Sequence, residues 1–263
     1  MRPMALLEIE GLKRFFGEGE AEVKALDGID LVIEEGEIIA LLGPSGSGKT
    51  TLLNLIAALD TPTEGSYRFN DEMVPSSKVE EMTAFRRNNI GYIFQFFNLL
   101  ADLTALENVL LVQELAGNRD KEFALKQLED VGLKGLDDRF PAQMSGGQRQ
   151  RVAIARSMAK RPRMILGDEL TGNLDSETTV HVMNALIDNC RRDEITTIFV
   201  THDESLTRFA TRVIRLDSGK IVSDEPGEMA GLKGQAKNAV RDLAKGGKKL
   251  VESIKDIAND IIG

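Results

Sequence analysis

Hydrophobic and polar residues form short alternating runs along the first part of the chain, which is the pattern of β-strands. Residues 5–10 alternate in part, and residues 29–33 alternate more clearly. An acidic, glycine-containing loop lies between them at 17–22. Residues 37–42 are mainly apolar and end in a glycine-rich turn. We therefore predict that the N-terminal part is a β subdomain followed by a short buried strand.

Helical composition follows this turn and dominates the middle of the chain. The predicted helices cover residues 51–59, 105–117, 121–132 and 148–160. Apolar strands return at 164–166 and 197–201. Strands that alternate with helices indicate a mostly parallel sheet in an α/β fold. The helical stretch at about 85–160 is predicted to be an inserted α-helical subdomain.

Residues 226–263 differ from the rest in both pattern and charge. Apolar residues recur there with a helical period that Gly246 and Gly247 interrupt. Seven Lys/Arg and five Asp/Glu give this segment a net charge of +2, which leaves −11 for residues 1–225. We predict an amphipathic helical tail. It could pack on its own domain or on a partner subunit, contact a membrane surface through its lysines, or be disordered.

The composition of the 263-residue chain is that of an ordinary globular protein, with 42% hydrophobic and 29% charged residues. A net charge of −9 argues against a broad nucleic-acid-binding face. Because Cys190 is the only cysteine, neither an internal disulfide nor a thiolate metal cluster is expected. No signal peptide is visible, and the longest apolar runs fall far short of the roughly 20 residues that span a bilayer.

A phosphate-binding loop stands between the strand at 37–42 and the next helix. Its residues are Gly43, Pro44, Ser45, Gly46, Ser47, Gly48, Lys49 and Thr50, and Thr51 follows them. The spacing fits G-x-x-x-x-G-K-[ST] at every fixed position. Its glycines let backbone N–H groups surround a phosphate at a helix N-terminus, and Lys49 can reach the β- and γ-phosphates. The Thr50 hydroxyl can ligate Mg²⁺.

Two carboxylates end the run at 164–169, whose other residues are apolar or glycine. In nucleotide-hydrolysing P-loop enzymes such a strand places its terminal Asp beside the magnesium, so Asp168 is the predicted metal ligand. Glu169 is the predicted general base that accepts a proton from the attacking water. A well-placed base contributes roughly 10²–10⁴-fold in rate.

With these motifs and those below, residues 5–225 resemble the ABC ATPase superfamily. Met144 is followed by residues that look like the family's signature sequence: Ser145, Gly146, Gly147 and Gln148. In the family this segment contacts the γ-phosphate of ATP bound to the opposite subunit. The physical basis is a helix N-terminus that presents backbone donors to an anion. The resemblance implies a P-loop NTPase core with a mostly parallel sheet, an N-terminal antiparallel β subdomain and an inserted helical subdomain.

The resemblance assigns further roles, residue by residue. Gln95 matches the glutamine that joins magnesium and the attacking water to the helical subdomain. Asp175, in Asn-Leu-Asp, matches the loop that crosses the dimer seam, and His202 matches the switch histidine on the γ-phosphate. An aromatic residue of the N-terminal sheet stacks on adenine in the family. Phe16 is the best positional match, with Phe15 as the alternative.

The chain departs from the family pattern at two positions. Met144 replaces a leucine, a swap of similar volume that should be tolerated. Leu170 replaces the proline that usually follows the catalytic glutamate. Because proline fixes φ, leucine is expected to leave this turn looser and the placement of Glu169 less certain.

Flanking segments resemble one branch of the superfamily. These segments are residues 59–65, 94–100, 103–109 and 170–175. The branch holds the lipoprotein-release, macrolide-exporter and cell-division ATPases of bacteria. It implies an ATP-dependent homodimer with Mg²⁺, at the cytoplasmic face of the inner membrane, that drives a separate permease subunit docked at residues 96–109. The apolar residues of this segment suit a docking groove, and they also suit the start of a core helix. A cell-division role and, less favoured, a soluble ABC ATPase of DNA repair or translation remain the alternatives, and the cargo stays open.

Overall fold

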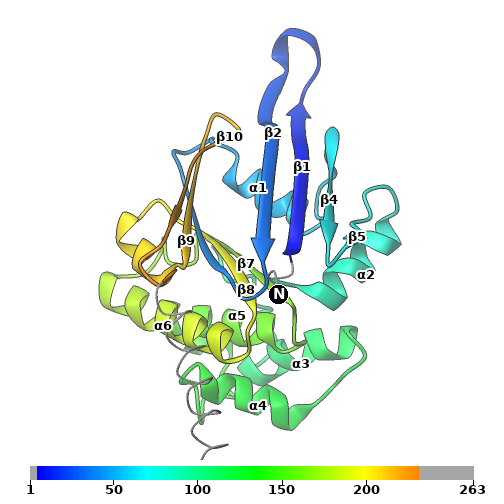
Figure 1. Ribbon diagram of the computed structural model, residues 1–263. Coiled ribbons are helices and arrows are strands. Elements are labelled where there is room, and N and C mark those ends of the chain that lie inside the picture. The colour runs from blue at the N-terminus through cyan, green and yellow to red at the C-terminus, as the bar shows by residue number, and fades with distance from the viewer. Residues whose placement is uncertain (1–4, 231–263) are drawn as a thin grey trace, which may run out of the picture.

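The computed structural model describes residues 5–230 and is shown in Figure 1. The strands are β1 (Ala5–Phe16), β2 (Val23–Glu34), β3 (Ile38–Leu42), β4 (Glu64–Phe69), β5 (Glu72–Met73), β6 (Ile90–Ile93), β7 (Met164–Asp168), β8 (Thr196–Val200), β9 (Arg212–Asp217) and β10 (Lys220–Pro226). The helices are α1 (Lys49–Ile56), α2 (Val79–Asn89), α3 (Ala105–Leu115), α4 (Lys121–Asp130), α5 (Gly146–Met158) and α6 (Ser176–Arg192), with short 3₁₀ turns at Gly19–Ala21, Pro141–Gln143 and Glu204–Phe209.

These strands form two sheets. The N-terminal sheet is antiparallel, in the order β2-β1-β4-β5. The larger sheet has the order β10-β9-β3-β8-β7-β6, and all its neighbours are parallel except the β9–β10 pair. The predicted fold class, with an antiparallel N-terminal sheet and a mostly parallel central sheet, is confirmed.

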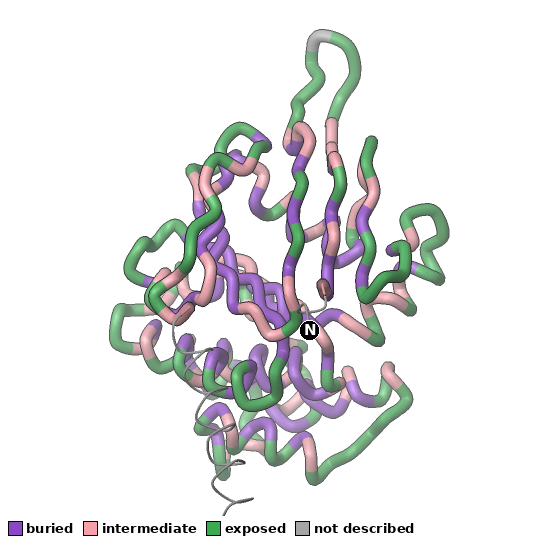
Figure 2. The backbone as a smooth tube through the Cα atoms, in the orientation of Figure 1, coloured by how far each residue is buried: buried purple, intermediate pink, exposed green. Residues whose placement is uncertain are grey.

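The central strands are buried on both faces, which explains why they are apolar throughout instead of alternating. On β3, Ile38, Ala40 and Leu42 belong to one apolar cluster, whereas Ile39 and Leu41 belong to another. The first cluster includes residues of α3 to α6, and the second includes residues of α1 and the antiparallel sheet. Figure 2 shows these strands buried, with the tip of the β1–β2 hairpin exposed.

The helical layer lies at the end of the molecule opposite the β1–β2 hairpin (Figure 1), where α5 packs against α3, α4 and α6. Cys190 is fully buried in α6, where it packs in the apolar cluster that includes the helices. The predicted helical subdomain at about 85–160 needs a correction at its start. Residues 90–93 form β6, which pairs with β7 at the edge of the central sheet, because this short run is apolar and its backbone completes the ladder.

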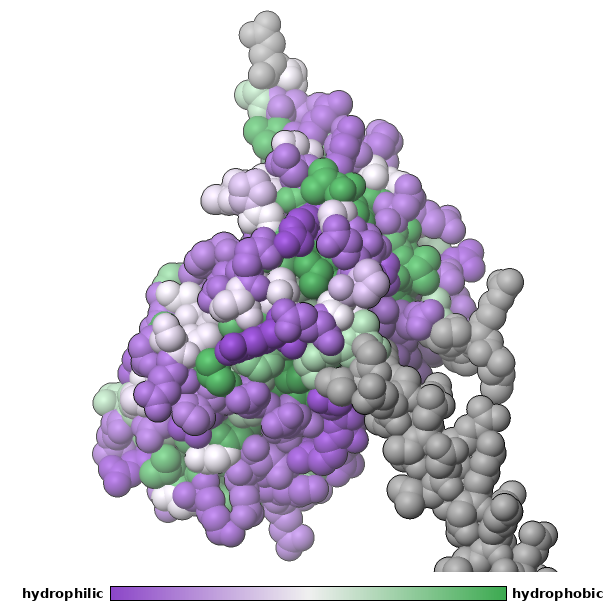
Figure 3. Space-filling model, turned by 60° about the vertical axis from the view of Figure 1, so that its left-hand side comes forward, coloured by the Kyte–Doolittle hydropathy of each residue, from purple (hydrophilic) through white to green (hydrophobic). Residues whose placement is uncertain are grey.

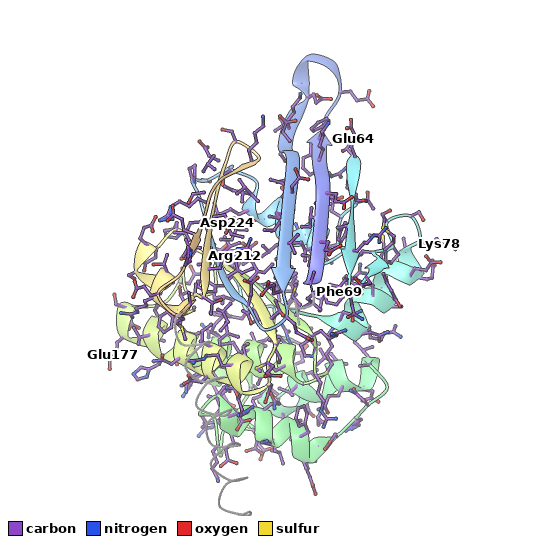
Figure 4. All side chains as sticks on the ribbon, in the orientation of Figure 1. Glu64, Phe69, Lys78, Glu177, Arg212 and Asp224 are labelled. Carbon is purple, nitrogen blue, oxygen red and sulfur yellow. The ribbon has the colours of Figure 1, made fainter. Side chains whose placement is uncertain are left out.

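The last strand of the described chain is fixed by charge as well as by pairing. Arg212 on β9 forms two hydrogen bonds to the Asp224 carboxylate on β10, at 2.7 and 2.6 Å, and Figure 4 shows the two side chains side by side. The same guanidinium donates to Glu37, 3.2 Å away, the residue directly before β3. Strand β10 therefore runs to Pro226, one residue past the predicted domain boundary, and the predicted helical tail falls almost entirely outside the described residues.

Hydrophilic side chains cover much of the face seen in Figure 3, and apolar side chains appear there in small separate patches. Among residues 5–230, no helix is long and apolar enough to cross a membrane.

Candidate nucleotide-binding and hydrolysis site

Four of the predicted site segments meet at the carboxyl ends of the parallel strands. The phosphate-binding loop follows β3, and Gln95 follows β6 after a single intervening residue. Glu169 directly follows β7, and His202 follows β8 after Thr201. Since β6, β7, β8 and β3 are neighbours in the sheet, segments far apart in the sequence share one edge. Ligands of open α/β sheets bind at this edge.

Two glycines of the phosphate-binding loop sit where no side chain fits. Gly43 has φ +149°, and a Cβ there would lie 2.1 Å from the carbonyl oxygen of Leu216. Gly48 has φ +102°, and a Cβ there would lie 2.4 Å from the carbonyl oxygen of Ala25. Left-handed backbone and close approach both require glycine. The loop is therefore held against β2 and β9 while α1 begins at Lys49 with its N–H groups free for an anion.

The Lys49 ammonium lies inside the loop. It donates hydrogen bonds to the carbonyl oxygens of Gly43 and Pro44, both at 2.8 Å. Burial lowers its pKa, while Glu169 and Asp168 act in the opposite direction. A buried cation is costly unless it is paired with an anion, and within residues 5–230 this ammonium donates only to neutral oxygen atoms. A bound triphosphate would supply the negative charge that pairs with it.

Thr50, at the start of α1, and Asp168, at the end of β7, bring two oxygen ligands together. The Thr50 hydroxyl donates to Asp168 Oδ1 at 3.3 Å. Burial is the main cause of a raised pKa at the Asp168 carboxyl, which the Thr50 hydrogen bond only partly opposes. Within residues 5–230 no cluster of three or more His, Cys, Asp or Glu side chains could hold a metal alone. One hydroxyl and one carboxylate suit Mg²⁺, which takes its other ligands from phosphates and water.

The Glu169 carboxylate lies between Gln95 and His202. Gln95 Nε2 donates to Glu169 Oε2 at 2.9 Å, and His202 Nδ1 lies 3.7 Å from Glu169 Oε1. About a third of the Glu169 side chain is exposed, so water can reach it. The sequence-predicted base, glutamine and histidine are therefore brought together, next to the Thr50–Asp168 pair.

The turn after Glu169 is packed. Gly172 N donates to the carbonyl oxygen of Glu169 at 3.3 Å, which closes a turn with Leu170 at its second position. Leu170 is only 4% exposed. The sequence predicts a looser turn here than proline would give, and the structure adds that the leucine side chain packs in the protein interior.

The signature segment lies on the helical side and makes no hydrogen bond to the phosphate-binding loop within residues 5–230. Ser145 caps α5 and forms a reciprocal capping box with Gln148. Gly147 faces α6, where a Cβ would lie 2.3 Å from Thr178 Cγ2. Asp175 caps α6 and accepts hydrogen bonds from Thr178, which lower the pKa of its carboxyl. Within the described part of one chain, Gly146, Gly147 and Asp175 therefore make no hydrogen bond to Lys49.

Both candidate adenine-stacking residues end β1. Phe16 is 43% exposed, and the Arg14 guanidinium lies 4.4 Å from its ring centre. Phe15 is partly covered, and the Lys24 ammonium lies 5.2 Å from its ring centre. Phe16 is the more open of the two, which keeps it the preferred prediction.

A groove of about 300 Å³ lies under the segment that follows β6, and the sequence did not reveal its charge. Its apolar part includes Phe94 and Leu100. Its polar part includes Arg86, Arg156 and Lys160, which share no sequence motif. We call these three residues the groove cations. Only folding brings them together, since Lys160 Nζ donates to the carbonyl oxygen of Arg86, 74 residues away.

The charged side chains in the lining of this groove are all cationic. No Asp or Glu lines the groove, and within residues 5–230 none of the three cations forms an ion pair. Burial, with added repulsion from Arg86 and Arg87, lowers the pKa of Lys160 to about 8. Burial also lowers the pKa of Arg156.

Comparison with known proteins identifies the family. The model of the ABC transporter family matches residues 26–172. An uncharacterised ABC transporter ATP-binding protein of Methanocaldococcus jannaschii is 46% identical over 221 residues, which cover 82% of this chain and 98% of that protein. The lipoprotein-releasing system ATP-binding protein LolD of Geobacter metallireducens is 43% identical and covers 84% of this chain and 99% of that protein.

Two further similarities concern architecture. The macrolide export ATP-binding/permease protein MacB of Marinobacter nauticus is 43% identical over 232 residues, which cover 87% of this chain but 36% of that protein. Among solved structures, a dimeric post-hydrolysis state of the ATP-binding cassette MJ0796 with ADP and Pi bound has a TM-score of 0.76 and 39% identity. It covers 84% of this chain and 98% of that chain.

Proposed function

The chain belongs to the ABC transporter ATPases, and we propose that two copies of it clamp two ATP molecules and thereby drive a separate permease subunit. The observation that carries this proposal is the position of Glu169. Its carboxylate is held by Gln95, lies 3.7 Å from His202 and stands beside the Thr50–Asp168 pair.

In the proposed hydrolysis the phosphate-binding loop holds the triphosphate. Lys49 leaves its loop carbonyls for the β- and γ-phosphates, and the N–H groups at the start of α1 surround them. Thr50, Asp168 and Gln95 would hold Mg²⁺, which when bound neutralises charge on the phosphates. Glu169 takes the proton from a water whose oxygen attacks the γ-phosphorus. The bond from that phosphorus to the β–γ bridging oxygen breaks, giving ADP and phosphate, and His202 contacts the γ-phosphate.

We infer a dimer because the nucleotide site of a single chain lacks the signature segment. The N-terminus of α5, from Ser145 to Gln148, makes no hydrogen bond to its own phosphate-binding loop within the described residues, and its Ser145 caps the helix. A second copy, related by a two-fold axis, would place this helix start against the γ-phosphate bound by the first. The solved dimer of the similar cassette, with ADP and Pi bound, supports this arrangement.

The groove beside β6 is the proposed docking site for the permease. Leu100 in its lining is 49% exposed, and Phe96, two residues after the lining residue Phe94, is 70% exposed, so an apolar docking element would cover hydrophobic surface. The groove cations call for a carboxylate on that element. In the MacB relative, the ATP-binding part occupies about a third of a chain named for ATP-binding and permease together. We propose that this chain serves such a permease as a peripheral subunit at the cytoplasmic face of the inner membrane.

The proposed task is mechanical work on a membrane-held cargo, of the lipoprotein-release or export type. The support is the similarity to proteins named for lipoprotein release and for macrolide export. The permease would select the cargo.

Glu169→Gln tests the proposal with the full-length chain. The variant should bind ATP as the wild type does, lose at least about 100-fold in ATP hydrolysis, and accumulate as an ATP-dependent dimer. Phosphate release and size-exclusion chromatography with and without ATP measure these effects. Unchanged hydrolysis in this variant would remove Glu169 from its proposed role.

A further inference from the structure

The face of the central sheet that packs on the helices has a gap in one row of side chains. Gly167 in β7 pairs with Ile93 in β6 and with Phe199 in β8. Paired residues of neighbouring strands point to the same face of a sheet. Ile93 and Phe199 are both buried in the cluster that contains the helices. Because Gly167 has no side chain, the space between its two neighbours must be filled from elsewhere.

Leu170 fills this gap from beyond the end of the strand. A Cβ added at Gly167 would lie 2.7 Å from Leu170 Cδ2 and 2.8 Å from both Cδ1 and Cγ. Such distances are too short for non-bonded carbon atoms. Leu170 is buried and belongs to the same apolar cluster as Ile93 and Phe199. The Leu170 side chain therefore occupies the space that a side chain at position 167 would need.

Glu169, which directly precedes Leu170, has a strained backbone conformation. Glu169 has φ +46°, in the left-handed region that non-glycine residues avoid. Such a conformation persists only where the surroundings hold it. On one side of Glu169, β7 is fixed in the sheet between β6 and β8. On the other side the Leu170 side chain is fixed in the gap over Gly167.

We propose that Leu170 is a positioning residue for hydrolysis: its side chain, seated over Gly167, holds Glu169 in its left-handed conformation between Gln95 and His202. This inference rests on the proposed role of Glu169 as general base. Members of the family usually restrict this turn with a proline. This chain instead has a buried leucine at position 170 and a glycine at position 167 that leaves room for it. Gly167 and Leu170 form one unit, and changing either alone should disturb the base.

A double-mutant cycle on the full-length chain tests the unit. Leu170→Ala empties the gap, and Gly167→Ala pushes the leucine out of it. Each should lower kcat on the order of tenfold or more, because small displacements of a catalytic group are costly. KM for ATP should stay within about twofold, since the phosphate-binding loop is untouched. In Gly167→Ala/Leu170→Ala the new methyl group no longer meets a leucine side chain, so kcat should be no lower than in Leu170→Ala and the two losses should not multiply.

Two controls separate positioning from a loss of stability. Leu186→Ala truncates a fully buried leucine of the same cluster on α6, and should lower the melting temperature with kcat retained. Leu170→Met keeps the volume and should restore most of kcat. Single variants with wild-type kcat, or a double variant whose loss is the product of the two single losses, would overturn the proposal.

The background variant Glu169→Gln distinguishes failure of this inference from failure of the proposed function. In that background Leu170→Ala should leave ATP-dependent dimer formation unchanged, because Leu170 acts through the carboxylate that is already absent. Loss of the dimer would show that Leu170 supports the fold of the site in general, and would overturn the positioning role. If Glu169→Gln itself hydrolyses ATP normally, the proposed function fails first, whatever the cycle gives.

Discussion

Gln95 Nε2 lies 2.9 Å from Glu169 Oε2, so a side chain that follows β6 holds a carboxylate that follows β7. The two residues are 74 positions apart, and parallel pairing of their strands brings them to one edge. Through Gln95 the proposed base is linked to the segment that leads into the helical layer and past the groove. A movement of that segment would therefore shift the Glu169 carboxylate through its hydrogen bond to Gln95.

Gln95→Glu should change the pH dependence of hydrolysis. The variant keeps the side-chain shape but sets a second carboxylate at hydrogen-bond distance from Glu169, and like charges raise the pKa of such a pair. We expect kcat near pH 7 to fall about 10- to 100-fold. The acid limb of the pH–rate profile should move upward, since the base must be deprotonated to act. Phosphate release across about pH 6 to 9 measures this. Gln95→Ala should lower kcat without moving the limb; an unshifted profile in Gln95→Glu would contradict the contact.

Phe16→Ala should weaken ATP binding if its ring stacks on adenine. Loss of about 1–3 kcal/mol of stacking corresponds to a roughly 5- to 150-fold rise in Kd, measured by isothermal titration calorimetry. Phe15→Ala is the matched control and should change Kd by less than about twofold. The opposite result would assign the stacking to Phe15.

Gly147→Ala should block the dimer without affecting the nucleotide site of the single chain. The added Cβ meets Thr178 Cγ2 at 2.3 Å, so α5 must move away from α6 and carry the signature segment with it. In the Glu169→Gln background, ATP-dependent dimer on size-exclusion chromatography should fall more than about tenfold, with ATP affinity of the monomer retained. Thr178→Ser removes only Cγ2 and keeps the hydroxyl that donates to Asp175. Combined with Gly147→Ala it should restore the dimer; no restoration would mean that another feature of Gly147 matters.

Association with the permease should weaken as pH rises through about 8. Burial lowers the pKa of Lys160 to about 8, so its charge is present below that pH and is lost above it. A carboxylate docked in the groove then loses one of its cations. Co-sedimentation with membranes that carry the permease, between about pH 7 and 9, measures this. Lys160→Arg should flatten the dependence, and Lys160→Glu should abolish association at every pH. An unchanged profile in Lys160→Arg would place the pH effect elsewhere.

Much of this protein could be predicted from local sequence, because local physics fixes it. The phosphate-binding loop needs glycines where the backbone is left-handed or closely approached, as at Gly43 and Gly48. Buried parallel strands must be apolar on both faces, which made β3, β7 and β8 recognisable. Helix starts need capping side chains, and Ser145 and Asp175 carry them. These features gave the fold class, the family and the list of residues around ATP.

Other features depended on which segments pack together. The run at 90–93 gave no sign that it joins the central sheet, since a short apolar stretch suits a strand or a buried helix equally. Leu170 suggested a loose turn, because only the position of Gly167 shows the space that the leucine fills. The groove cations share no motif, and the repulsion of Lys160 by Arg86 exists only once the folded chain brings these two residues together. The sequence alone determined which chemistry this chain carries. The tertiary structure decided how the base is held and where a partner's charge is needed, because distances between residues remote in the chain exist only in the folded state.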